Sequence, residues 1–503
     1  MKNRLLIAIS LVGSAALPAS AEPKLGAIFS DHMVIQREQP LPVWGSAAPG
    51  EEILVRFAGQ EKKARTNHAG EWQVRLDPLE ANAEARELEI VGEKSVSIKD
   101  VLVGDVWLCS GQSNMDFPLY KTGDKSEIAK ADYPRIRQFH VRAASVNAPQ
   151  QWVDGAWDVC TPQTALRFTA VGYYFGRDLH LSQKIPIGLI NSSVGGTGAR
   201  LWLPTAALQA SPVLSPLLDE DLKLKIMFCT KIRDTSPEAA AWLADVEAAR
   251  AANQPLPLLP PLPKQDHYAG YLYNGMISPL TRFPIKGVLW YQGESNTTSF
   301  QAARQYRPLL TTLIDSWRTA WGIGEFPFYI VQLPSFGTTV AEHPWAQLRE
   351  SQRLVSRAVP QSGLVVTVDL GEANTWHPLN KRDVGMRAAL LARAKTYGEK
   401  ITGTGPEYES MRVVGNEIVL TFAKHSGPLV ANGGAPQHFT VAGADKKFFP
   451  ATARIEGDTV IVSSAEVPAP VVVRYAWAGN PEGANLFNAA GLPASPFTTA
   501  PPD

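Results

Sequence analysis

Cysteine, unbalanced charge and long apolar runs are all scarce in this sequence. Only three of its 503 residues are cysteines, which excludes a disulfide-dense scaffold and leaves open one bridge with a free thiol or three separate thiols. The 48 Lys and Arg balance the 48 Asp and Glu, so neither nucleic acid nor an anionic membrane is an expected partner. An uncharged small molecule or a polysaccharide is the more natural partner.

The most apolar stretch lies at the N-terminus, where residues 1–21 are typical of a secretory signal peptide. Two basic residues precede the apolar stretch 5–12, and Ala19-Ser20-Ala21 supplies small residues for cleavage. The stretch is shorter than the roughly 20 residues that a membrane-spanning helix needs. We therefore expect a protein that is periplasmic or secreted.

The remaining chain divides into three parts by its hydrophobic pattern. Short alternating apolar runs over 22–99 predict an N-terminal β-sandwich domain. Over 100–400, apolar strands alternate with amphipathic helices, which predicts an α/β domain with a parallel sheet covered on both faces. A helical and proline-rich insertion at about 200–283 is expected to be solvated, and part of it could wall a substrate groove. Residues 401–503 return to a β pattern and predict a C-terminal β-rich domain.

The α/β part has identifiable strands and helices. Strands are expected at 101–109, 185–193, 285–292, 326–334 and 362–370, and helices at 164–181, 300–321, 342–358 and 380–398. Ligands of such sheets bind beyond the carboxyl ends of the strands. The polar residues that follow each strand are therefore the candidates for chemistry.

These strand ends carry the parts of an acyl-transfer site. Ser113 follows the first strand, Gly195 the second, Gln292 and Glu294 the third, and His377 the fifth. They supply a nucleophile, oxyanion donors, an acid and a base. Each has a commoner structural use: the serine as a helix cap, the glycine in a tight turn, the acid on a solvated loop and the histidine in packing. Their joint occurrence at successive strand ends favours a hydrolase.

Four separated motifs then point to one family. GDVWLCSGQSNM, LYNGMISPL, WYQGESN and HPLNKRDVGMRAAL, in this order, closely resemble the sialate O-acetylesterase family of SGNH-type carbohydrate esterases. The likeness runs from about Leu25 to the C-terminus. It implies an SGNH-hydrolase three-layer sandwich flanked by the two β-rich domains, and a serine esterase that removes O-acetyl groups from carbohydrates. No cofactor is implied, and the sequence has no His/Cys/Asp cluster at zinc spacing.

The resemblance also implies roles for individual residues. Ser113 corresponds to the nucleophile and His377 to the base. The oxyanion hole corresponds to the backbone N–H of Ser113, a backbone N–H at Gly195 and the side-chain amide of Gln292. The acyl pocket is expected to include Asn114 and Asn274.

The acid of the triad is where this sequence departs from the family pattern. SGNH hydrolases often carry an Asp three residues before the catalytic histidine, and relatives in the family commonly carry one two residues before it. Asn374 and Thr375 stand at those positions here. Glu294, Glu372 or Asp369 could substitute. We favour Glu294, because some related acetylesterases resemble a Ser-His-Glu arrangement that uses this block. A Ser-His dyad oriented by a backbone carbonyl stays open.

Two other functions compete with the esterase. A carbohydrate-binding protein on an inactive esterase scaffold would suit the missing Asp and exposed Trp72 and Trp477. A glycosidase could use Glu294 and Asp369 as its pair of carboxylates, although it would leave the GQSN motif unexplained.

The sugar is left open between two classes. O-acetylated sialic acid would call for a cationic contact, such as Arg200, Arg282 or Arg349, to its carboxylate. Acetylated hemicellulose, such as xyloglucan or xylan oligosaccharides, would call for a neutral groove with aromatic platforms. Thirteen tryptophans and zero net charge favour the polysaccharide.

Overall fold

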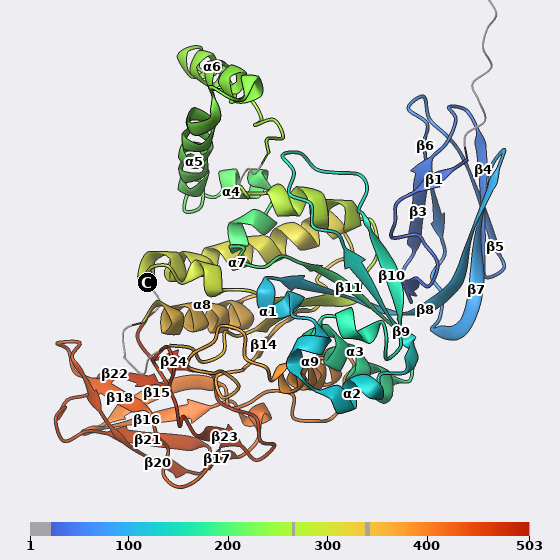
Figure 1. The fold of residues 1–503 in the computed structure, drawn as a ribbon. Helices are drawn as coiled ribbons and strands as arrows, with labels where there is room; N and C mark the ends of the chain where they lie inside the picture. Colours follow the sequence, from blue (N-terminus) through green and yellow to red (C-terminus); the bar gives the residue numbers. More distant parts are fainter. Residues whose placement is uncertain (1–21, 264–266, 338–342, 502–503) are drawn as a thin grey trace, which may run out of the picture.

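The computed structural model describes residues 22–263, 267–337 and 343–501 of the chain (Figure 1). The expected signal peptide lies outside the described residues. The fold is mixed α/β, with an N-terminal group of strands and a C-terminal group of strands on opposite sides of a central sheet and its helices (Figure 1). No helix in the three described ranges combines the length and apolar character needed to cross a bilayer.

The N-terminal strands form one small β-sheet of their own and an extension of the large sheet, which they join through β8. Their burial alternates with period two, as in β6, whose Trp72, Val74 and Leu76 point inward. One sheet has the order β1-β3-β6, and β4 pairs with β5 and β7 in the other. The bounds are Lys24–Leu25 for β1, Val34–Gln36 for β2, Leu41–Ser46 for β3, Glu52–Phe57 for β4, Gln60–Arg65 for β5, Glu71–Leu76 for β6 and Asn82–Val91 for β7.

One long strand, β8 (Ser95–Gly111), connects this region to the central sheet. Its first half pairs antiparallel with β7, and its second half pairs in parallel with β11 and β12. From Val101 to Gly111 every residue is buried. The boundary expected near residue 99 therefore falls inside a continuous strand, so backbone hydrogen bonds couple the two regions.

The central sheet has the order β10-β9-β11-β8-β12-β13-β14. All neighbours from β9 to β14 are parallel, and β10 is an antiparallel edge strand. The five expected apolar runs form β8, β11, β12, β13 and β14, and the structure adds β9 and β10, which the sequence pattern missed. The bounds are Tyr133–Val141 for β9, Gly155–Cys160 for β10, Ile187–Ser193 for β11, Gly287–Tyr291 for β12, Phe328–Val331 for β13 and Ser362–Val365 for β14.

Helices cover both faces of this sheet. Alternate residues of β8 separate between two cores: Val106 and Leu108 pack on the side of α7 and α8, and Trp107 and Cys109 on the side of α3 and α9. Strands buried on both faces explain why the sequence runs were continuously apolar. The helices are α3 (Ala170–Gln183), α7 (Phe300–Trp321), α8 (Pro344–Ala358) and α9 (Lys381–Lys395).

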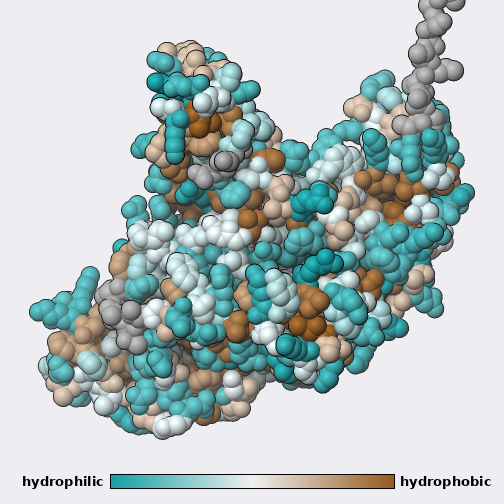
Figure 2. Space-filling model, viewed as in Figure 1, coloured by the Kyte–Doolittle hydropathy of each residue, from teal (hydrophilic) through white to brown (hydrophobic). Residues whose placement is uncertain are grey.

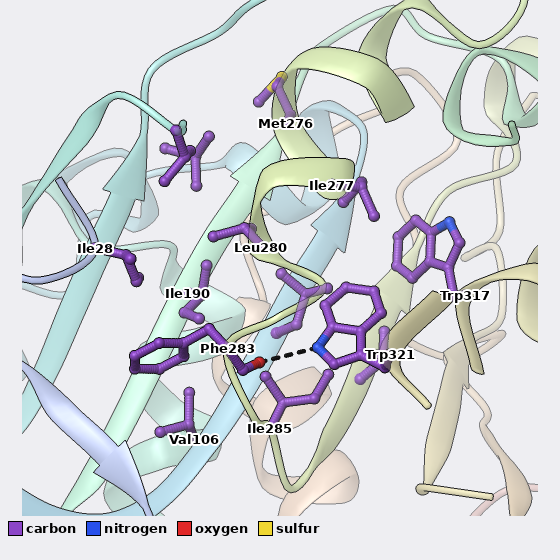
Figure 3. Close-up of a cluster of buried hydrophobic side chains, with 14 of the residues drawn as sticks. Ile28, Val106, Ile190, Met276, Ile277, Leu280, Phe283, Ile285, Trp317 and Trp321 are labelled. Carbon is purple, nitrogen blue, oxygen red and sulfur yellow. Dashed lines mark hydrogen bonds between the residues drawn. The ribbon is translucent and has the colours of Figure 1, made fainter. Parts of the chain in front are cut away.

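Figure 3 shows part of the core on the α7 side. Val106 of β8 and Ile190 of β11 pack there with Phe283, Ile285 and Trp321, all nearly inaccessible to solvent. The indole N–H of Trp321 donates to the carbonyl of Phe283 at 3.0 Å, so the buried polar atom is satisfied (Figure 3). Each such large apolar side chain contributes roughly 1.5–3 kcal/mol on burial.

Within the insertion near 200–283, α5 and α6 form an arm that stands apart from the rest of the molecule (Figures 1 and 2), whereas Met276 and Phe283 near the end of the insertion pack in the central core. The helices of the insertion are α4 (Thr205–Ala210), α5 (Pro216–Ile232) and α6 (Pro237–Ala251). The arm has a core of its own, which includes Cys229 and Trp242. Helix α6 begins with an N-cap at Ser236.

The C-terminal strands form a separate antiparallel unit with its own core. Arg349 of α8 joins it to the central region, since this fully buried guanidinium donates to the carbonyls of Leu333, Pro334, Ala478 and Gly479. The strands are β15 (Tyr408–Val414), β16 (Glu417–Phe422), β17 (Leu429–Ala431), β18 (Phe439–Ala442), β19 (Phe448–Pro450), β20 (Thr452–Glu456), β21 (Thr459–Ser463), β22 (Val472–Tyr475), β23 (Leu486–Asn488) and β24 (Phe497–Thr498).

All three cysteines, Cys109, Cys160 and Cys229, are buried and unbridged. Burial raises the pKa of the Cys109 and Cys160 thiols to about 12. Of the two possibilities left by the sequence, the structure has three separate thiols, and a fully buried neutral thiol is a packing group rather than a nucleophile.

Candidate active site

Ser113 is presented by a tight turn at the carboxyl end of β8. Gly111 has φ +138, and a Cβ at this position would lie 2.1 Å from the carbonyl oxygen of Tyr291 on the neighbouring strand β12. Glycine is the residue that tolerates both the backbone angle and the close approach. The N–H of Gln112 then donates to the same carbonyl at 3.0 Å. Ser113 becomes the first residue of the short helix α1 (Ser113–Asp116), after the N-cap position, so its hydroxyl is not the helix cap.

The hydroxyl of Ser113 meets the ring of His377. The distance from Ser113 Oγ to His377 Nε2 is 2.7 Å, although the residues are 264 positions apart in the sequence. Partial burial, together with the nearby charges of Lys381 and Lys121, lowers the pKa of His377 below its ordinary value. The neutral imidazole is therefore favoured near pH 7, and its Nε2 can accept the serine proton.

None of the three candidate carboxylates contacts this imidazole. Glu294 is 3% exposed and accepts a hydrogen bond from Asn114 Nδ2 at 2.5 Å. Asp369 forms an ion pair with Arg387 at 2.6 Å. Glu372 accepts from the backbone N–H of Leu379 at 3.0 Å. Among the described residues the ring of His377 makes one hydrogen bond, to Ser113, so the geometry is that of a dyad.

The backbone on either side of His377 is tied down instead. Asn114 Nδ2 donates to the carbonyl of Trp376 at 2.8 Å, and Lys381 Nζ donates to the carbonyl of Pro378 at 2.5 Å. Lys381 Nζ also donates to Asn114 Oδ1 at 2.7 Å. Asn114, which follows Ser113, is thus linked to both residues that flank His377.

Lys381 and Glu294 place opposite charges at the two ends of the Asn114 amide. Lys381 is fully buried, and burial lowers its pKa to about 7 although Glu294 and Glu372 act in the opposite direction. Burial raises the pKa of Glu294, against the hydrogen bond from Asn114 and the charge of Lys381. An ammonium, an amide and a carboxylate in this order orient the amide, with its oxygen toward Lys381 and its nitrogen toward Glu294.

The backbone N–H groups of Ser113 and Gly195 belong to two turns that lie next to each other. A Cβ on Gly195 would lie 3.4 Å from the Cβ of Ser113, so the turn after β11 runs directly alongside the nucleophile. Within the described ranges, neither the N–H of Ser113 nor that of Gly195 donates to another protein group. Such free, fixed donors are what an oxyanion requires.

Gln292 is positioned differently from the expectation. Its Nε2 donates to Gln112 Oε1 at 3.1 Å, to the carbonyl of Thr197 at 3.1 Å and to Asn296 Oδ1 at 2.9 Å. With both amide hydrogens engaged, this fully buried side chain offers no donor to a substrate. It joins the ends of β8, β11 and β12 to one another.

The two expected pocket asparagines are also structural in their contacts. The amide of Asn114 is used by Glu294, the carbonyl of Trp376 and Lys381. Asn274 donates to the carbonyl of Val146 at 3.1 Å and so holds the loop between β9 and β10.

Sequence reasoning missed several polar residues around the site. Lys381 stood in the HPLNK motif and Gln112 in the GQSN motif, and both were passed over. A further polar chain lies beside Ser113, where Ser193 Oγ approaches Asp116 Oδ1 at 3.3 Å and Asn191 Oδ1 at 2.5 Å. Burial raises the pKa of Asp116. The only sequence signal for Lys381 and Gln112 was their place within the motifs. A motif gives the position of a residue in the chain, but it does not predict which side chains that residue contacts.

The surroundings of the site include an exposed tryptophan, and none of the three expected arginines contacts Ser113 or His377. Trp376, next to His377, is 50% exposed and its ring centroid lies 4.9 Å from that of Phe336. Of the three expected arginines, Arg349 is buried against backbone carbonyls, and Arg282 lies over the ring of Trp44 in the N-terminal region. Arg200 Nε lies 3.1 Å from Asp221 Oδ1. Over the described part of the chain, no group of three His, Cys, Asp or Glu side chains could hold a metal ion.

Comparisons with known proteins agree with the chemistry of this site. The family described as "Carbohydrate esterase, sialic acid-specific acetylesterase" matches residues 263–391, which include His377 and Lys381. Sialate O-acetylesterase of Mus musculus is 27% identical over 98% of this chain and 97% of its own, and that of Homo sapiens 27% over 94% and 92%. The crystal structure of a carbohydrate acetylesterase from Xanthomonas citri covers 95% of this chain and 99% of its own, with 38% identity and a TM-score of 0.81.

Proposed function

The chain belongs to the sialate O-acetylesterase family of carbohydrate esterases and is a carboxylic ester hydrolase; we propose that it releases acetate from O-acetylated carbohydrates through an acetyl-enzyme on Ser113. The observation that carries this proposal is the 2.7 Å contact between Ser113 Oγ and His377 Nε2, beside two free backbone donors. We further propose that the central α/β region is of the SGNH-hydrolase type. Because the chain belongs to a family of esterases, we set aside the two other functions considered from the sequence, a non-catalytic carbohydrate-binding protein and a glycosidase.

The reaction follows from these positions. His377 Nε2 takes the proton of Ser113 as Oγ attacks the carbonyl carbon of the acetyl ester. The carbonyl oxygen becomes negative and accepts from the N–H groups of Ser113 and Gly195; one donor of this kind contributes about 10²–10³-fold to kcat. The imidazolium returns the proton to the departing sugar oxygen, which leaves an acetyl group on Oγ. Water then attacks the acetyl carbonyl with His377 as base, and acetate and Ser113 are released.

Glu294 acts in this proposal as a positioning residue rather than as the acid of a triad. In a triad, the carboxylate bonds to the second ring nitrogen and stabilises the imidazolium directly. Here Glu294 and Lys381 orient Asn114, and Asn114 and Lys381 hold the carbonyls of Trp376 and Pro378. The base is thus fixed through its backbone.

A neutral acetylated polysaccharide, such as xyloglucan or xylan, is the proposed substrate class. The half-exposed indole of Trp376 beside the base is suited to pack against a sugar ring. None of Arg200, Arg282 and Arg349 makes a contact with Ser113 or His377, so a cation for the carboxylate of sialic acid is not supplied by the three candidates.

The expected export and domain division remain predictions. We propose that the segment 1–21 directs the chain to the periplasm or the medium, where plant polysaccharide would be encountered. We also propose that 401–503 is a separate structural unit, whereas 22–99 and 100–400 share the strand β8 and one hydrophobic core.

Acetate release measured side by side tests the function. Acetylated xyloglucan oligosaccharides, acetylated xylan and O-acetylated sialic acid are offered to the enzyme and to its Ser113→Ala variant. We expect the unaltered enzyme, and not Ser113→Ala, to release acetate from at least one of the two acetylated polysaccharide substrates. We expect its release of acetate from O-acetylated sialic acid to be slower. Equal release by Ser113→Ala would contradict the proposal, and sole release from sialic acid would contradict the substrate class.

A further inference from the structure

A second pocket of polar and aromatic side chains lies between the N-terminal strands and the loop that joins β9 to β10. It has a volume of about 240 Å³ and is lined by Trp44, Trp72, Trp152, Glu71 and Arg282, among others. That volume is below the usual 300–1,000 Å³ of sites for drug-sized ligands, which suits a smaller unit such as one sugar ring. It shares no lining residue with the contacts of Ser113 and His377 described above.

Three tryptophans line the pocket, and Trp152 is the one with an exposed ring. Trp44 and Trp72 are 3% and 4% exposed, and Trp152 is 37% exposed at the rim. A Cβ at Gly26 would lie 2.9 Å from Cε3 of Trp152, so the benzene part of this indole rests on the backbone there. A Trp that is held on one side and open on the other offers a large contact area at low entropic cost.

The polar side chains around the tryptophans are held in place by neighbouring residues and still have hydrogen-bonding groups available for a ligand. The carboxylate of Glu71 accepts from Asn67 Nδ2 at 3.1 Å and from Gln151 Nε2 at 3.0 Å, and these bonds, with the charge of Arg282, lower its pKa. The Arg282 guanidinium lies 5.4 Å from the ring centroid of Trp44. Neither Arg282 nor Arg65, which also lines the pocket, makes a hydrogen bond within the described residues.

This combination fits a sugar. Hydroxyl groups both donate and accept, so they can pair with a held carboxylate and with free guanidinium N–H groups at once. The apolar face of a sugar ring can pack on an indole. A simple anion would meet the carboxylate of Glu71, and an apolar ligand would offer no hydrogen-bond acceptor to the two guanidinium groups.

The position of the pocket relates it to the catalytic edge. His140, near the end of β9, is opposite Asn191 in the parallel pairing of β9 with β11. The loop that contains Trp152 therefore leaves the sheet at the edge that carries Ser113. The same loop is bound to the carbonyls of Tyr271 and Asn274 by the N–H groups of Val146 and Gln150. Gln151 and Trp152 therefore reach the pocket from the edge that carries Ser113, whereas its other lining residues belong to the N-terminal strands and to the segment before β12.

We propose that this pocket is a second carbohydrate-binding site, which holds a sugar ring of the polysaccharide whose acetyl groups are removed at Ser113. The identity of the polysaccharide rests on the proposed function, whereas binding itself does not depend on catalysis. Binding at this site would raise the affinity of the enzyme for long polysaccharide chains. It would not change the activity of the enzyme on small esters.

The test uses the full chain and ligands without acetyl groups. Affinity is measured by retardation in native gels that contain deacetylated xyloglucan or xylan. Trp152→Ala and Glu71→Gln are compared with Trp152→Phe, which keeps an aromatic platform, and with Met227→Ala, which truncates an exposed side chain on the arm. Esterase activity of each variant is measured with p-nitrophenyl acetate and with acetylated xyloglucan oligosaccharides and polymer.

We expect Trp152→Ala to weaken polysaccharide binding by about tenfold, and Glu71→Gln to weaken it by less. The two controls, Trp152→Phe and Met227→Ala, should bind polysaccharide as the unaltered enzyme does. The KM for acetylated polymer rises in Trp152→Ala, with kcat and the rate on p-nitrophenyl acetate unchanged. Binding unaffected in both Trp152→Ala and Glu71→Gln overturns the inference, as does no retardation of the unaltered enzyme by either polysaccharide. Loss of esterase activity in the unaltered enzyme would instead contradict the proposed function.

Discussion

Lys381 Nζ lies 2.7 Å from the side-chain oxygen of Asn114, the residue directly after Ser113. The same nitrogen donates to the carbonyl of Pro378, directly after His377. One fully buried ammonium therefore connects the segment after β8 with the segment before α9. This link lets a Ser-His pair keep its geometry without a carboxylate on the imidazole.

Replacing Lys381 by methionine should slow catalysis more than it weakens binding. Methionine keeps much of the volume and removes the bonds to Asn114 and Pro378, so the ring of His377 loses its fixed position. We expect kcat to fall by about 10–100-fold, the usual effect of losing a supporting partner, with KM changed little. Lys395→Met, at the other end of α9, is the control and should retain activity. A rise in KM at constant kcat would show that Lys381 contacts substrate instead.

Replacing Glu294 by glutamine should reveal whether the enzyme has a triad. Because Glu294 touches Asn114 and not His377, the amide oxygen of Gln can still accept from Asn114 Nδ2. We expect a loss in kcat/KM of less than about tenfold, whereas removing the carboxylate of a true triad costs about 10⁴-fold. Asp369→Asn and Glu372→Gln should behave in the same way. A loss near 10⁴-fold in one of the three would identify it as the acid.

The dependence of kcat/KM on pH should follow the pKa of His377, which the charges around its ring shift. Since burial and the charges of Lys381 and Lys121 lower the pKa of His377, kcat/KM should rise to half its maximum below pH 6.5. Lys121→Met removes one positive charge near His377. The protonated ring then becomes less unfavourable, so the pKa of His377 and the midpoint of the pH profile should both rise. Lys125→Met, which lies on the nearby helix α2 (Lys125–Ala129), is the control. A midpoint that does not move in Lys121→Met would contradict the assignment of His377 as the titrating base.

Gly111→Ala should damage both stability and activity. Its Cβ would lie 2.1 Å from the carbonyl oxygen of Tyr291, at φ +138, so β8 and β12 would have to separate. We expect a loss of about 3 kcal/mol or more in the free energy of unfolding, measured by urea denaturation. Gly123→Ala is the matched control, because Gly123 also has a positive φ but open space around its Cβ position. Its cost should stay near 1 kcal/mol, and equal losses in the two variants would contradict the steric argument.

The sequence predicted the central sheet well where strands were apolar on both faces. The run 101–109 and its four partners form β8, β11, β12, β13 and β14, because burial on both sides leaves a continuous apolar signal. Strand β9 (Tyr133–Val141) was missed, since it carries a proline and alternating arginines near the edge of the sheet. Strand β10 (Gly155–Cys160) is the edge strand and is only partly buried, so its sequence is not continuously apolar.

The site could be predicted as a set of strand ends but not as a network of contacts. Ser113, Gly195 and His377 come together because parallel strands deliver their ends to one edge. The direction of a buried amide is decided by its neighbours, so Gln292 binds Gln112, Thr197 and Asn296. Glu294 likewise follows the nearest donor, Asn114. A lysine at the start of a helix is usually solvated, and no pattern indicated that Lys381 is buried.

The most direct test of the account is covalent labelling of the nucleophile. The enzyme is mixed with p-nitrophenyl acetate, quenched in acid and digested, and the acetylated peptide is identified by mass spectrometry. The account predicts one acetyl group on Ser113, none in Ser113→Ala, and labelling slowed by at least about 10³-fold in His377→Ala, with all three proteins folded by circular dichroism. An acetyl group on another residue, or turnover by Ser113→Ala at the rate of the unaltered enzyme, would contradict it.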